Sequence, residues 1–476
     1  MGVATVFEEH ASVLPHWLAQ GAQGATLVSL DAHLDLQFVE PARIDRLRHA
    51  RTPEAWRALQ AAHPLDPDRR ACFGIEDFLH PAAQLGLVRH LVWVAPPHVL
   101  RDGAMGALGA LAQMEGVTPE QLESFSMGRG GWLQGRLLGL DIVAGTLAQL
   151  QGLPIEGPLL LDIDADYFVA VPGDTLWCDP LAACRQLRDW LGPARPLTVA
   201  RSVGTGFLPL RHRFIADLVA AAWDERADLP HWSRLAAAER DPAQREALLR
   251  AELAGHPDCA ATLHALSLAC GDPAEAQRLQ VAAAGRDAAY ADDPLRTLGA
   301  ARARGVRVPA AERVALERIV AAQPPSPERR AAWVALGLLQ AGEGRLQDAL
   351  HCDQQSRQGP AGHPDLALAI ARLCLATGDA PRAAPWLARA AEDDETRVQA
   401  WLLLCGAALQ KGDAVAALAW AERAHQAAPA WPLPLQWMEQ AARRAGRAAA
   451  AHQAQADRSQ LLHRLDAVAR RLAIPA

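Results

Sequence analysis

The spacing of hydrophobic and polar residues divides the chain into two parts. Up to about residue 220, short apolar runs alternate with longer amphipathic segments. This alternation is typical of strands and helices that follow one another around a largely parallel sheet. The expected strands are residues 25–30, 90–95, 158–161 and 196–200, and the expected helices are residues 52–62, 105–114 and 181–191. The pattern predicts an α/β domain over residues 1–225.

Beyond about residue 224 the strand signals end and a repeat begins. Its period can be measured from four glycines that stand 34 residues apart, each between two helical segments: Gly344, Gly378, Gly412 and Gly446. Gly271 and Gly305 are also 34 residues apart, and the 39-residue step from Gly305 to Gly344 implies an insertion. Because glycine is the usual residue just past a helix end, the pattern predicts pairs of helices joined by short turns.

This period, with its placement of glycine and alanine, resembles the tetratricopeptide repeat. The resemblance implies an all-α helical solenoid of about six repeats over residues 235–465. Stacked helix pairs of this kind leave a long concave groove, which commonly binds an extended peptide or a partner protein. A substrate or a protein partner is therefore expected in the groove.

Composition and charge exclude several classes of protein. The chain has 47 Lys and Arg residues against 54 Asp and Glu residues, a net charge of -7, and Lys411 is its only lysine. A general nucleic-acid-binding surface is therefore not expected. Glu8 and Glu9 stand where a secretory signal would be basic, and no run approaches ~18 uninterrupted apolar residues. We expect a cytoplasmic protein without a membrane partner.

The eight cysteines form no Cys-x-x-Cys pair, which argues against a zinc ribbon and a dense disulfide framework.

Potential metal ligands follow two of the expected strands. They occupy alternate positions: Asp31, His33 and Asp35 after the strand at 25–30, and Asp162, Asp164 and Asp166 at the end of the apolar run at 158–161. Alternate residues that leave a strand point the same way, and the carboxyl ends of strands line the binding crevice of an open α/β sheet. Clustered carboxylates are costly to bury unless cations neutralise them. The two motifs therefore predict a metal site.

The ligand types also narrow the choice of metal. Carboxylates with one or two imidazoles suit Mn²⁺ or Mg²⁺ better than the thiolate-rich sites of structural Zn²⁺, although Fe²⁺ accepts the same set. Two such ions can activate water for attack at an unreactive carbon or phosphorus centre. The expected reaction class is hydrolysis.

The two motifs support a family resemblance. The segment Asp31-Ala32-His33-Leu34-Asp35 resembles the Asp-Ala-His-x-Asp signature of the ureohydrolases, which include arginase and agmatinase, and Asp162-Ile163-Asp164 is similar to their later Asp-x-Asp. The segments "FEEHASVLPHWL", "LVSLDAHLDL", "GIEDFLHPAAQLGLVRHLVWVAP" and "LLLDIDADYF" more closely resemble an arginase-like family that contains the peptide arginases. The resemblance spans roughly residues 5–215 and leaves out the repeats.

The resemblance implies an activity and a cofactor. Ureohydrolases share an α/β fold with a binuclear manganese centre that hydrolyses guanidinium groups to urea, and peptide arginases convert arginine side chains of precursor peptides to ornithine. The Gly-Gly-Asp-His segment of ordinary arginases is absent here, which argues against free arginine as the substrate. We expect two Mn²⁺ ions and an arginine-containing peptide or protein as substrate.

The resemblance also implies how the ligands are shared. His10 in "EEH", with Asp31, Asp35 and Asp162, would hold the first ion, and His33 with Asp164 the second, although the exact sharing stays open and His16 competes with His10. Asp166 is either a ligand or a residue that faces the substrate.

Catalytic and substrate-binding residues are less constrained. Glu76, with Asp77 as the alternative, could bind a guanidinium through two hydrogen bonds, or could be a helix-start acid. His80 or His98 could protonate the leaving amine, since imidazole titrates near neutrality. Arg201, with Ser202, leaves the strand at 196–200 and could form a loop that contacts substrate.

Two other functions compete with the hydrolysis of a guanidinium group. A deacetylase of the same broad fold would hold one Zn²⁺ through an Asp, His and Asp set, whereas the second acid motif favours two ions. A non-enzymatic scaffold would rely on the repeats alone and would retain the hydrolase domain only as a vestige.

Overall fold

The computed structural model describes residues 3–66, 70–101, 103–170, 173–192, 195–291, 293, 295–296, 310–322, 324–357, 362–394 and 396–473. Its amino-terminal part is built around an eight-stranded sheet with the order β1-β10-β7-β2-β3-β6-β5-β4. The strands are β1 (Ala4–Phe7), β2 (Ala25–Leu30), β3 (Val88–Val94), β4 (Ser126–Met127), β5 (Leu133–Leu137), β6 (Leu140–Gly145), β7 (Leu159–Asp164) and β10 (Leu197–Ala200). Strands β1, β10, β7, β2, β3 and β6 run parallel, and β5 and β4 are antiparallel. A separate hairpin pairs β8 (Val169–Ala170) with β9 (Thr175–Leu176).

Helices cover both faces of this sheet and create two hydrophobic cores. On one face, Ile163 and Val199 of the sheet pack with Leu187 of α8 (Pro180–Leu191) and Phe214 of α9 (Phe214–Asp224). On the other face, strand residues such as Leu27 pack with helices α1 (Val13–Ala19), α4 (Leu79–Gln84) and α5 (Gly103–Leu111). Shorter helices complete the layer: α2 (Pro41–His49), α3 (Pro53–Arg57), α6 (Pro119–Ser124) and α7 (Leu147–Leu150). The expected α/β architecture is confirmed at this level.

Several predicted elements need correction. Strand β2 has the predicted bounds, whereas β7 continues three residues beyond the predicted end, so that Asp162 and Asp164 belong to the strand itself. The predicted helix at 52–62 is wrong in length, because α3 ends at Arg57 and the chain then turns to pair Gln60 with Phe73. Strands β1, β5 and β6 were not predicted, since their short segments carry no alternation that distinguishes them from loops.

The carboxy-terminal part consists of helices in the described residues after Asp224. They are α10 (Leu229–Arg240), α11 (Arg245–Gly255), α12 (Ala260–Ala269), α13 (Pro273–Arg286), α15 (Ala310–Ala322), α16 (Pro327–Gly342), α17 (Leu346–Ser356), α18 (Pro364–Ala376), α19 (Ala380–Ala390), α20 (Arg397–Gln410), α21 (Ala414–Ala427), α22 (Pro432–Arg444) and α23 (Ala448–Ala473). Consecutive helices pack against each other, most extensively within α12–α13, α16–α17, α18–α19, α20–α21 and α22–α23. The prediction of helix pairs after residue 224 is confirmed.

The four glycines of the repeat end equivalent helices. Gly344, Gly378, Gly412 and Gly446 have φ angles of 79°, 78°, 80° and 68°, a left-handed conformation that a Cβ atom disfavours. At each turn the residue after the glycine donates its backbone N–H to a carbonyl five residues earlier, as Asp379 does to Cys374. The 34-residue spacing therefore reflects a repeated helix end. Gly305 of the predicted upstream repeat lies outside the described residues, and Gly271 does not have a positive φ.

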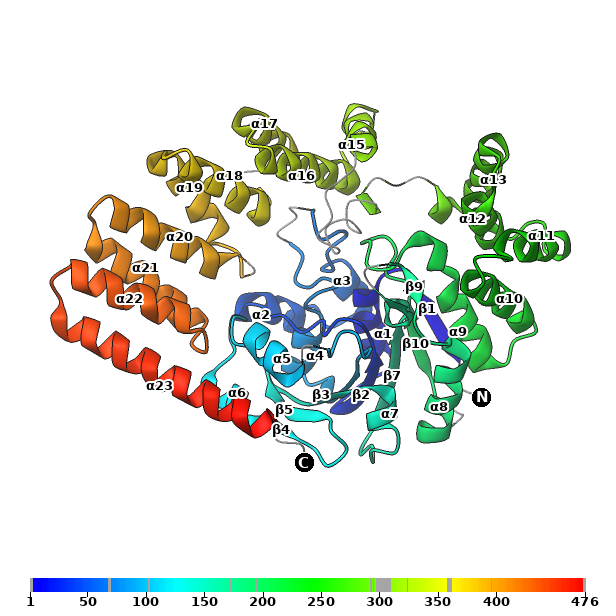
Figure 1. Cartoon of the computed structure of the whole chain (residues 1–476), viewed down its shortest axis with the longest axis horizontal. Helices are drawn as coiled ribbons and strands as arrows, with labels where there is room; N and C mark the ends of the chain where they lie inside the picture. Colours follow the sequence, from blue (N-terminus) through cyan, green and yellow to red (C-terminus); the bar gives the residue numbers. More distant parts are fainter. Residues whose placement is uncertain are drawn as a thin grey trace.

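The helices curve around the α/β part (Figure 1). The helical region begins beside the sheet at α9 and α10 and continues through α15 to α18. It returns to the α/β part with α23, which contacts α5, α6 and β4. Leu235 of α10 belongs to the core that includes α8 and α9, and Val468 and Leu472 of α23 belong to the core on the opposite face of the sheet. Both ends of the helical region are thus anchored on the α/β part by buried apolar residues.

Ion pairs add to this contact between the two parts. Arg43 lies 2.8 Å from Asp394, Arg330 lies 2.8 Å from Asp66, and Arg397 lies 2.8 Å from Glu115.

All eight cysteines are free. Among the described residues, no helix combines the length and the apolar character that crossing a membrane requires.

Candidate metal centre

The sheet brings the two acid motifs to one edge. Strand β2 pairs in parallel with β7, with Ser29 opposite Asp162 and Leu30 opposite Ile163. The chain therefore leaves β2 at Asp31 beside Asp164. Asp35 follows in the loop after β2, and Asp166 lies in the 3-10 helix η2 (Ala165–Phe168) that follows β7. On the other side of β7, strand β10 places Thr198 beside Asp162 and Ala200 beside Asp164. Carboxylates from two strands thus converge where parallel strands end.

His10 lies in the middle of this acid cluster. It begins the 3-10 helix η1 (His10–Ser12), which follows β1, and the residue is 1% exposed. Its Nε2 atom lies 2.6 Å from Asp162 Oδ2, and its Nδ1 atom lies 2.8 Å from Asp35 Oδ2, 3.3 Å from Asp31 Oδ2 and 3.2 Å from Asp164 Oδ2. The imidazole therefore contacts all four carboxylates. His16 makes no such contact, and its Nε2 atom instead accepts a hydrogen bond of 2.8 Å from Gln20 Nε2.

A second group of ligand atoms adjoins the first. His33 Nδ1 lies 2.8 Å from Asp166 Oδ2 and 3.9 Å from Asp31 Oδ1. Two trios, His10–Asp31–Asp164 and Asp31–His33–Asp166, each offer ligand atoms within 4.8 Å of one another, and Asp31 belongs to both. These histidine and aspartate groups, all buried except His33, could hold a metal ion. The structure brings Asp166 next to His33, where Asp164 had been expected.

The protonation of the cluster shows how much negative charge it concentrates. Burial raises the pKa of Asp31 well above its usual range, and the charges of Asp35 and Asp166 add to the effect. Burial opposes the charged form of His10, but Asp162 and Asp164 outweigh it, so the pKa of His10 is raised well above its usual value. The pKa of Asp164 is also raised, by burial and by Asp166. Protons on these groups balance the carboxylates, a role that a divalent cation fills equally well.

The second trio titrates differently because His33 and Asp166 favour each other's charged forms. Burial disfavours the charged form of His33, but the carboxylate of Asp166 beside it raises the pKa of His33 to about 9. Burial likewise disfavours ionised Asp166, yet His33 outweighs it and the pKa of Asp166 is lowered. In this state the two residues form an ion pair, with the Phe207 ring packed edge-on against His33 at 4.8 Å.

Hydroxyl groups orient two of the carboxylates. Ser202 donates a hydrogen bond of 2.6 Å to Asp164 Oδ2, Thr198 donates one to Asp162 Oδ1, and Ser29 lies 3.5 Å from Asp162 Oδ2. Partners of this kind keep ligand atoms aimed at a shared point. These contacts were not predicted, although Ser29 precedes the last residue of β2 and Ser202 lies two residues beyond the end of β10.

Two residues of the cluster have strained backbones. Asp35 has a φ of 47° and Ser202 a φ of 49°, and both are non-glycine residues in the left-handed region. Such a conformation costs on the order of 1 to 3 kcal/mol and persists only where the surrounding structure enforces it. Both residues contact the cluster directly, at His10 and at Asp164. The fold therefore accepts strain to place these two side chains.

The loop after β10 also contacts the residue before His10. Thr205 donates a hydrogen bond of 3.0 Å to Glu9, and a Cβ atom at Gly204 would come within 2.4 Å of Glu9 Oε1. Burial raises the pKa of Glu9 to about 7, despite its hydrogen bonds to Thr205 and Gly204. Any larger residue at position 204 would displace the Glu9 carboxylate from this position. These contacts of Glu9 were not predicted.

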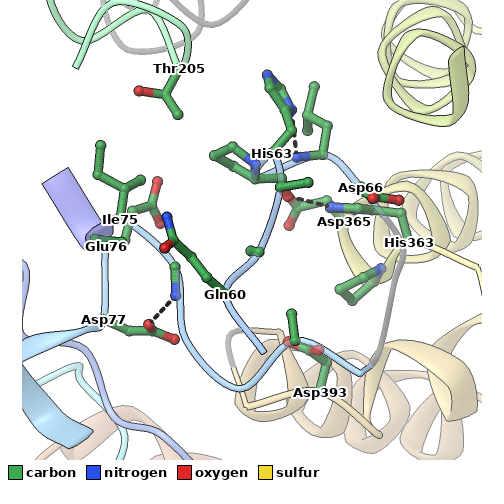
Figure 2. A pocket seen from close by; sticks show the side chains of 18 of the residues that line it. Gln60, His63, Asp66, Ile75, Glu76, Asp77, Thr205, His363, Asp365 and Asp393 are labelled. Carbon is green, nitrogen blue, oxygen red and sulfur yellow. Dashed lines mark hydrogen bonds between the residues drawn. The ribbon is translucent and has the colours of Figure 1, made fainter. Parts of the chain in front are cut away.

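Glu76, Asp77 and His80 lie close together in the sequence, in the turn before α4 and in its first residues. Glu76 accepts a hydrogen bond of 3.3 Å from Gln37 Nε2 and lines a cavity between the α/β part and the helical region (Figure 2). Glu9 and Ala11, the neighbours of His10 on both sides, also line this cavity.

Asp77 is buried, accepts a 2.7 Å hydrogen bond from Gly74 N–H and contacts Arg43, so it supports the fold of this loop. His80 Nδ1 accepts the backbone N–H of Val39 at 2.8 Å, and burial lowers the pKa of His80 to about 4. With this pKa, His80 is neutral at pH 7 and is not the imidazolium that a general acid requires.

His98 and Arg201, the remaining predicted residues, make contacts outside the cluster. His98 follows β3 and packs edge-on against Trp177, whose ring also contacts Tyr167 beside Asp166. Burial and Arg101 lower the pKa of His98. Arg201 lies 2.6 Å from both Glu8 and Asp217, so its guanidinium joins β1 to α9. The contacts of Arg201 give it a structural role and do not direct it to the cluster.

No protein-family model matches this chain, and no curated protein matches its sequence.

Proposed function

We propose that the protein is a metal-dependent hydrolase of the arginase-like class that converts an arginine side chain, in a peptide or protein, to ornithine and urea. The observation that carries the proposal is the buried cluster of His10, Asp31, Asp35, Asp162 and Asp164, with His33 and Asp166 beside it. These positions coincide with the motifs that resemble the ureohydrolases.

The donor set fits two hard divalent ions, and Mn²⁺ is our first choice. Carboxylate oxygens and imidazole nitrogens are the ligands that such ions accept, and no thiol belongs to either trio. Because Asp31 is shared by the two trios, its two oxygen atoms could serve adjacent ions. When bound, a pair of ions supplies the Lewis acidity that activates water for attack on a guanidinium carbon.

The protein residues around the cluster would position the substrate. Water adds to the guanidinium carbon, the bond from that carbon to the side-chain nitrogen breaks, and a proton must reach the leaving amine. Glu76 lies on the wall of the adjoining cavity, where a carboxylate can accept hydrogen bonds from a guanidinium. Of the two predicted proton donors, His98 is the better candidate, because His80 is held by the Val39 N–H.

The helical region would hold the distal part of the substrate. Its repeated helix pairs support a tetratricopeptide-like solenoid, whose inner side faces the α/β part in Figure 1. Binding a peptide away from the reacting atoms raises the effective concentration of its arginine at the cluster. The alternative of a single-ion deacetylase is less well supported, because it leaves the second trio without a role.

The proposal is tested by metal content and by product. Protein purified without chelator and resupplied with Mn²⁺ should contain about two ions per chain, and a double variant Asp31→Ala, Asp162→Ala should lose them. Arginine peptides should then yield urea and ornithine in equal amounts, and acetyl-lysine peptides should not react. Bound metal without urea from any arginine substrate would contradict the reaction, and absence of metal from both proteins would favour a scaffold.

A further inference from the structure

The first helices of the helical region bring a thiol, an imidazole and a carboxylate together. His231 belongs to α10 and Glu252 to α11, and Cys259 is the N-cap residue of α12; the three helices pack one after another (Figure 1). His231 Nδ1 lies 2.5 Å from Glu252 Oε1, and His231 Nε2 lies 3.2 Å from Cys259 Sγ. The imidazole therefore links the carboxylate to the thiol through its two nitrogen atoms.

These contacts determine where the protons lie. Burial opposes the ionised form of Glu252, but Arg234 and His231 outweigh it and lower the pKa of Glu252. An ionised carboxylate only accepts hydrogen bonds, so Nδ1 of His231 carries a proton. Its Nε2 atom can then take the thiol proton of Cys259 and leave a thiolate beside an imidazolium. A base placed in this way activates a cysteine as a nucleophile.

The start of α12 also favours a thiolate. At an N-cap, backbone N–H groups without helical partners and the helix dipole stabilise negative charge. Burial raises the pKa of Cys259, but His231 and the hydroxyl and backbone N–H of Thr262 outweigh it, and the pKa is lowered. Thr262 is 0% exposed, and its hydroxyl has no hydrogen-bond partner in the part of the chain that the structure describes. A thiolate, or an oxygen atom attached to the sulfur, would give this buried donor an acceptor.

The opposite end of α12 carries a cysteine in a contrasting setting. Cys270 is the C-cap residue of the same helix and is partly exposed, as Cys259 is. Its Sγ atom lies 3.2 Å from Glu275 Oε2, at the helix end whose dipole disfavours an anion. The backbone of Asp272 lowers the pKa of Cys270, but burial and Glu275 outweigh it, and the pKa is raised. Burial also raises the pKa of each of the other six cysteines, so Cys259 is the one whose pKa is lowered.

A metal ion fits this site less well than it fits the strand-end cluster. His231, Glu252 and His256 do offer ligand atoms within 4.8 Å of one another. However, Arg234 contacts both oxygen atoms of Glu252. The carboxylate therefore already has a cationic partner, and the guanidinium would repel a divalent ion placed beside it. The contact between the imidazole and the thiol is the feature that this charge balance leaves to be explained.

The surroundings of the sulfur favour a small reactant. Cys259 is partly exposed and follows three exposed residues, 256–258. His231 is only 5% exposed, so the imidazole side of the sulfur is closed by the protein. A hydroperoxide is small and uncharged, whereas a peptide or another bulky substrate would need room on both sides of the sulfur.

We propose that Cys259 is a reactive thiolate that a hydroperoxide oxidises to a sulfenic acid. The sulfur forms a bond to the terminal oxygen of the hydroperoxide, the O–O bond breaks, and the leaving alkoxide or hydroxide takes the proton held at His231 Nε2. Sulfur loses two electrons and the peroxide gains them, so the products are the sulfenic acid and an alcohol or water. The Thr262 hydroxyl donates to the new oxygen atom.

The decisive measurement compares the two cysteines of α12 in the unmodified full chain. The protein is treated with hydrogen peroxide at pH 7, the peroxide is removed with catalase, and the chain is denatured in dimedone and a mass-tagged maleimide, which mark sulfenic acids and remaining thiols. Mass spectrometry of the peptides should show Cys259 oxidised at least about tenfold faster than Cys270, with dimedone on Cys259. Oxidation of Cys259 no faster than that of Cys270, or no dimedone on Cys259, would overturn the proposal.

Two histidine variants assign the effect to the imidazole. His231→Gln should slow the oxidation of Cys259 about tenfold at pH 7 and leave Cys270 unchanged. At about pH 9.5, where a thiol ionises without help, the variant should react as fast as the wild type. His256→Gln is the control, because His256 Nε2 lies 3.4 Å from Glu252 Oε1 but belongs to no contact of the sulfur. Equal losses in both variants, or a deficit that persists at high pH, would contradict the role of His231 as the base.

This inference stands apart from the proposed function. None of its residues belongs to the strand-end cluster, and the measurement requires neither bound metal nor urea formation. Selective oxidation of Cys259 in a chain that releases no urea would leave the thiolate site standing and overturn only the hydrolysis. The comparison of Cys259 with Cys270 needs no substitution, so it holds even if a histidine variant does not fold.

Discussion

The molecule has two acid-rich regions that differ in how their charge is balanced. At the strand ends, four carboxylates surround His10 within 3.3 Å, and no arginine contacts them in the described structure. Between the two parts of the chain, acids such as Asp394 and Asp66 are paired with Arg43 and Arg330. The first region can remain ionised only with added cations, whereas the second is largely neutralised by the protein. Acidic residues alone therefore do not indicate a metal site; buried and mutually close acids do.

The strongest test of this difference is the same substitution at two equally buried aspartates. Asp162 and Asp353 are both 0% exposed, but Asp353 contacts Arg357 and Arg389 within the helical region. We expect Asp162→Asn to lower urea formation by about 1000-fold, equivalent to about 4 kcal/mol in the transition state, together with metal content. Asp353→Asn should lower the denaturation midpoint and leave metal content intact. Equal metal loss in both would remove the distinction.

A smaller effect is expected at the residue that orients Asp164. Replacing Ser202 with Ala removes its hydrogen bond to Asp164 and keeps a side chain in the left-handed conformation. Metal affinity should fall by about 10- to 100-fold, as for other residues that orient ligands. Ser202→Gly loses the same hydroxyl but relieves the backbone strain, so it should unfold at higher denaturant concentration than Ser202→Ala. Unchanged metal affinity in both variants would assign Ser202 a purely structural role.

The arginine pairs between the two parts should contribute to stability. Arg397 lies between Glu40 and Glu115, and the latter side chain is 11% exposed. Arg397→Met would leave Glu115 without its cation and should lower the free energy of unfolding by about 2 kcal/mol. Chemical denaturation measures this cost, and the double variant Arg397→Met, Glu115→Gln should recover part of it. If Arg397→Met alone leaves the free energy of unfolding unchanged, the ion pair does not hold the helical region in place.

A comparable effect is expected from pH. Burial raises the pKa of Glu115 from 4.5 to about 7, against the attraction of Arg397, and Asp394 and Glu40 raise it further. A carboxyl group whose pKa is higher in the folded chain stabilises the fold fully below its unfolded pKa, and this contribution is lost as the pH rises through 7. The free energy of unfolding should therefore fall by roughly 2 kcal/mol between pH 5 and pH 8 because of this group. In the variant Glu115→Gln, the free energy of unfolding should depend less on pH over this range. An unchanged pH dependence would show that Glu115 is not the group responsible.

The local parts of the structure could be predicted from the sequence. The strand at Ala25–Leu30, the helix pairs after residue 224 and the glycines at their turns depend on contacts between near neighbours. The acid motifs were predictable for the same reason, because alternate residues at a strand end share a direction and parallel strands end at one edge. His10 could be named only through the family resemblance, since nothing in its own segment indicates its partners.

The remaining features depended on tertiary structure, because they join residues that are far apart along the chain. Ser202 reaches Asp164 only through the pairing of β10 with β7, and Asp166 meets His33 only because β7 lies beside β2. The cavity requires the helical region to return over residues 60–77, and α23 to pack its Val468 into the core beside the sheet. The sequence by itself determined which residue types stand at strand and helix ends; packing over long separations decided which of them face one another. Packing has this role because it depends on the shape and burial of complete elements, and no single segment carries that information.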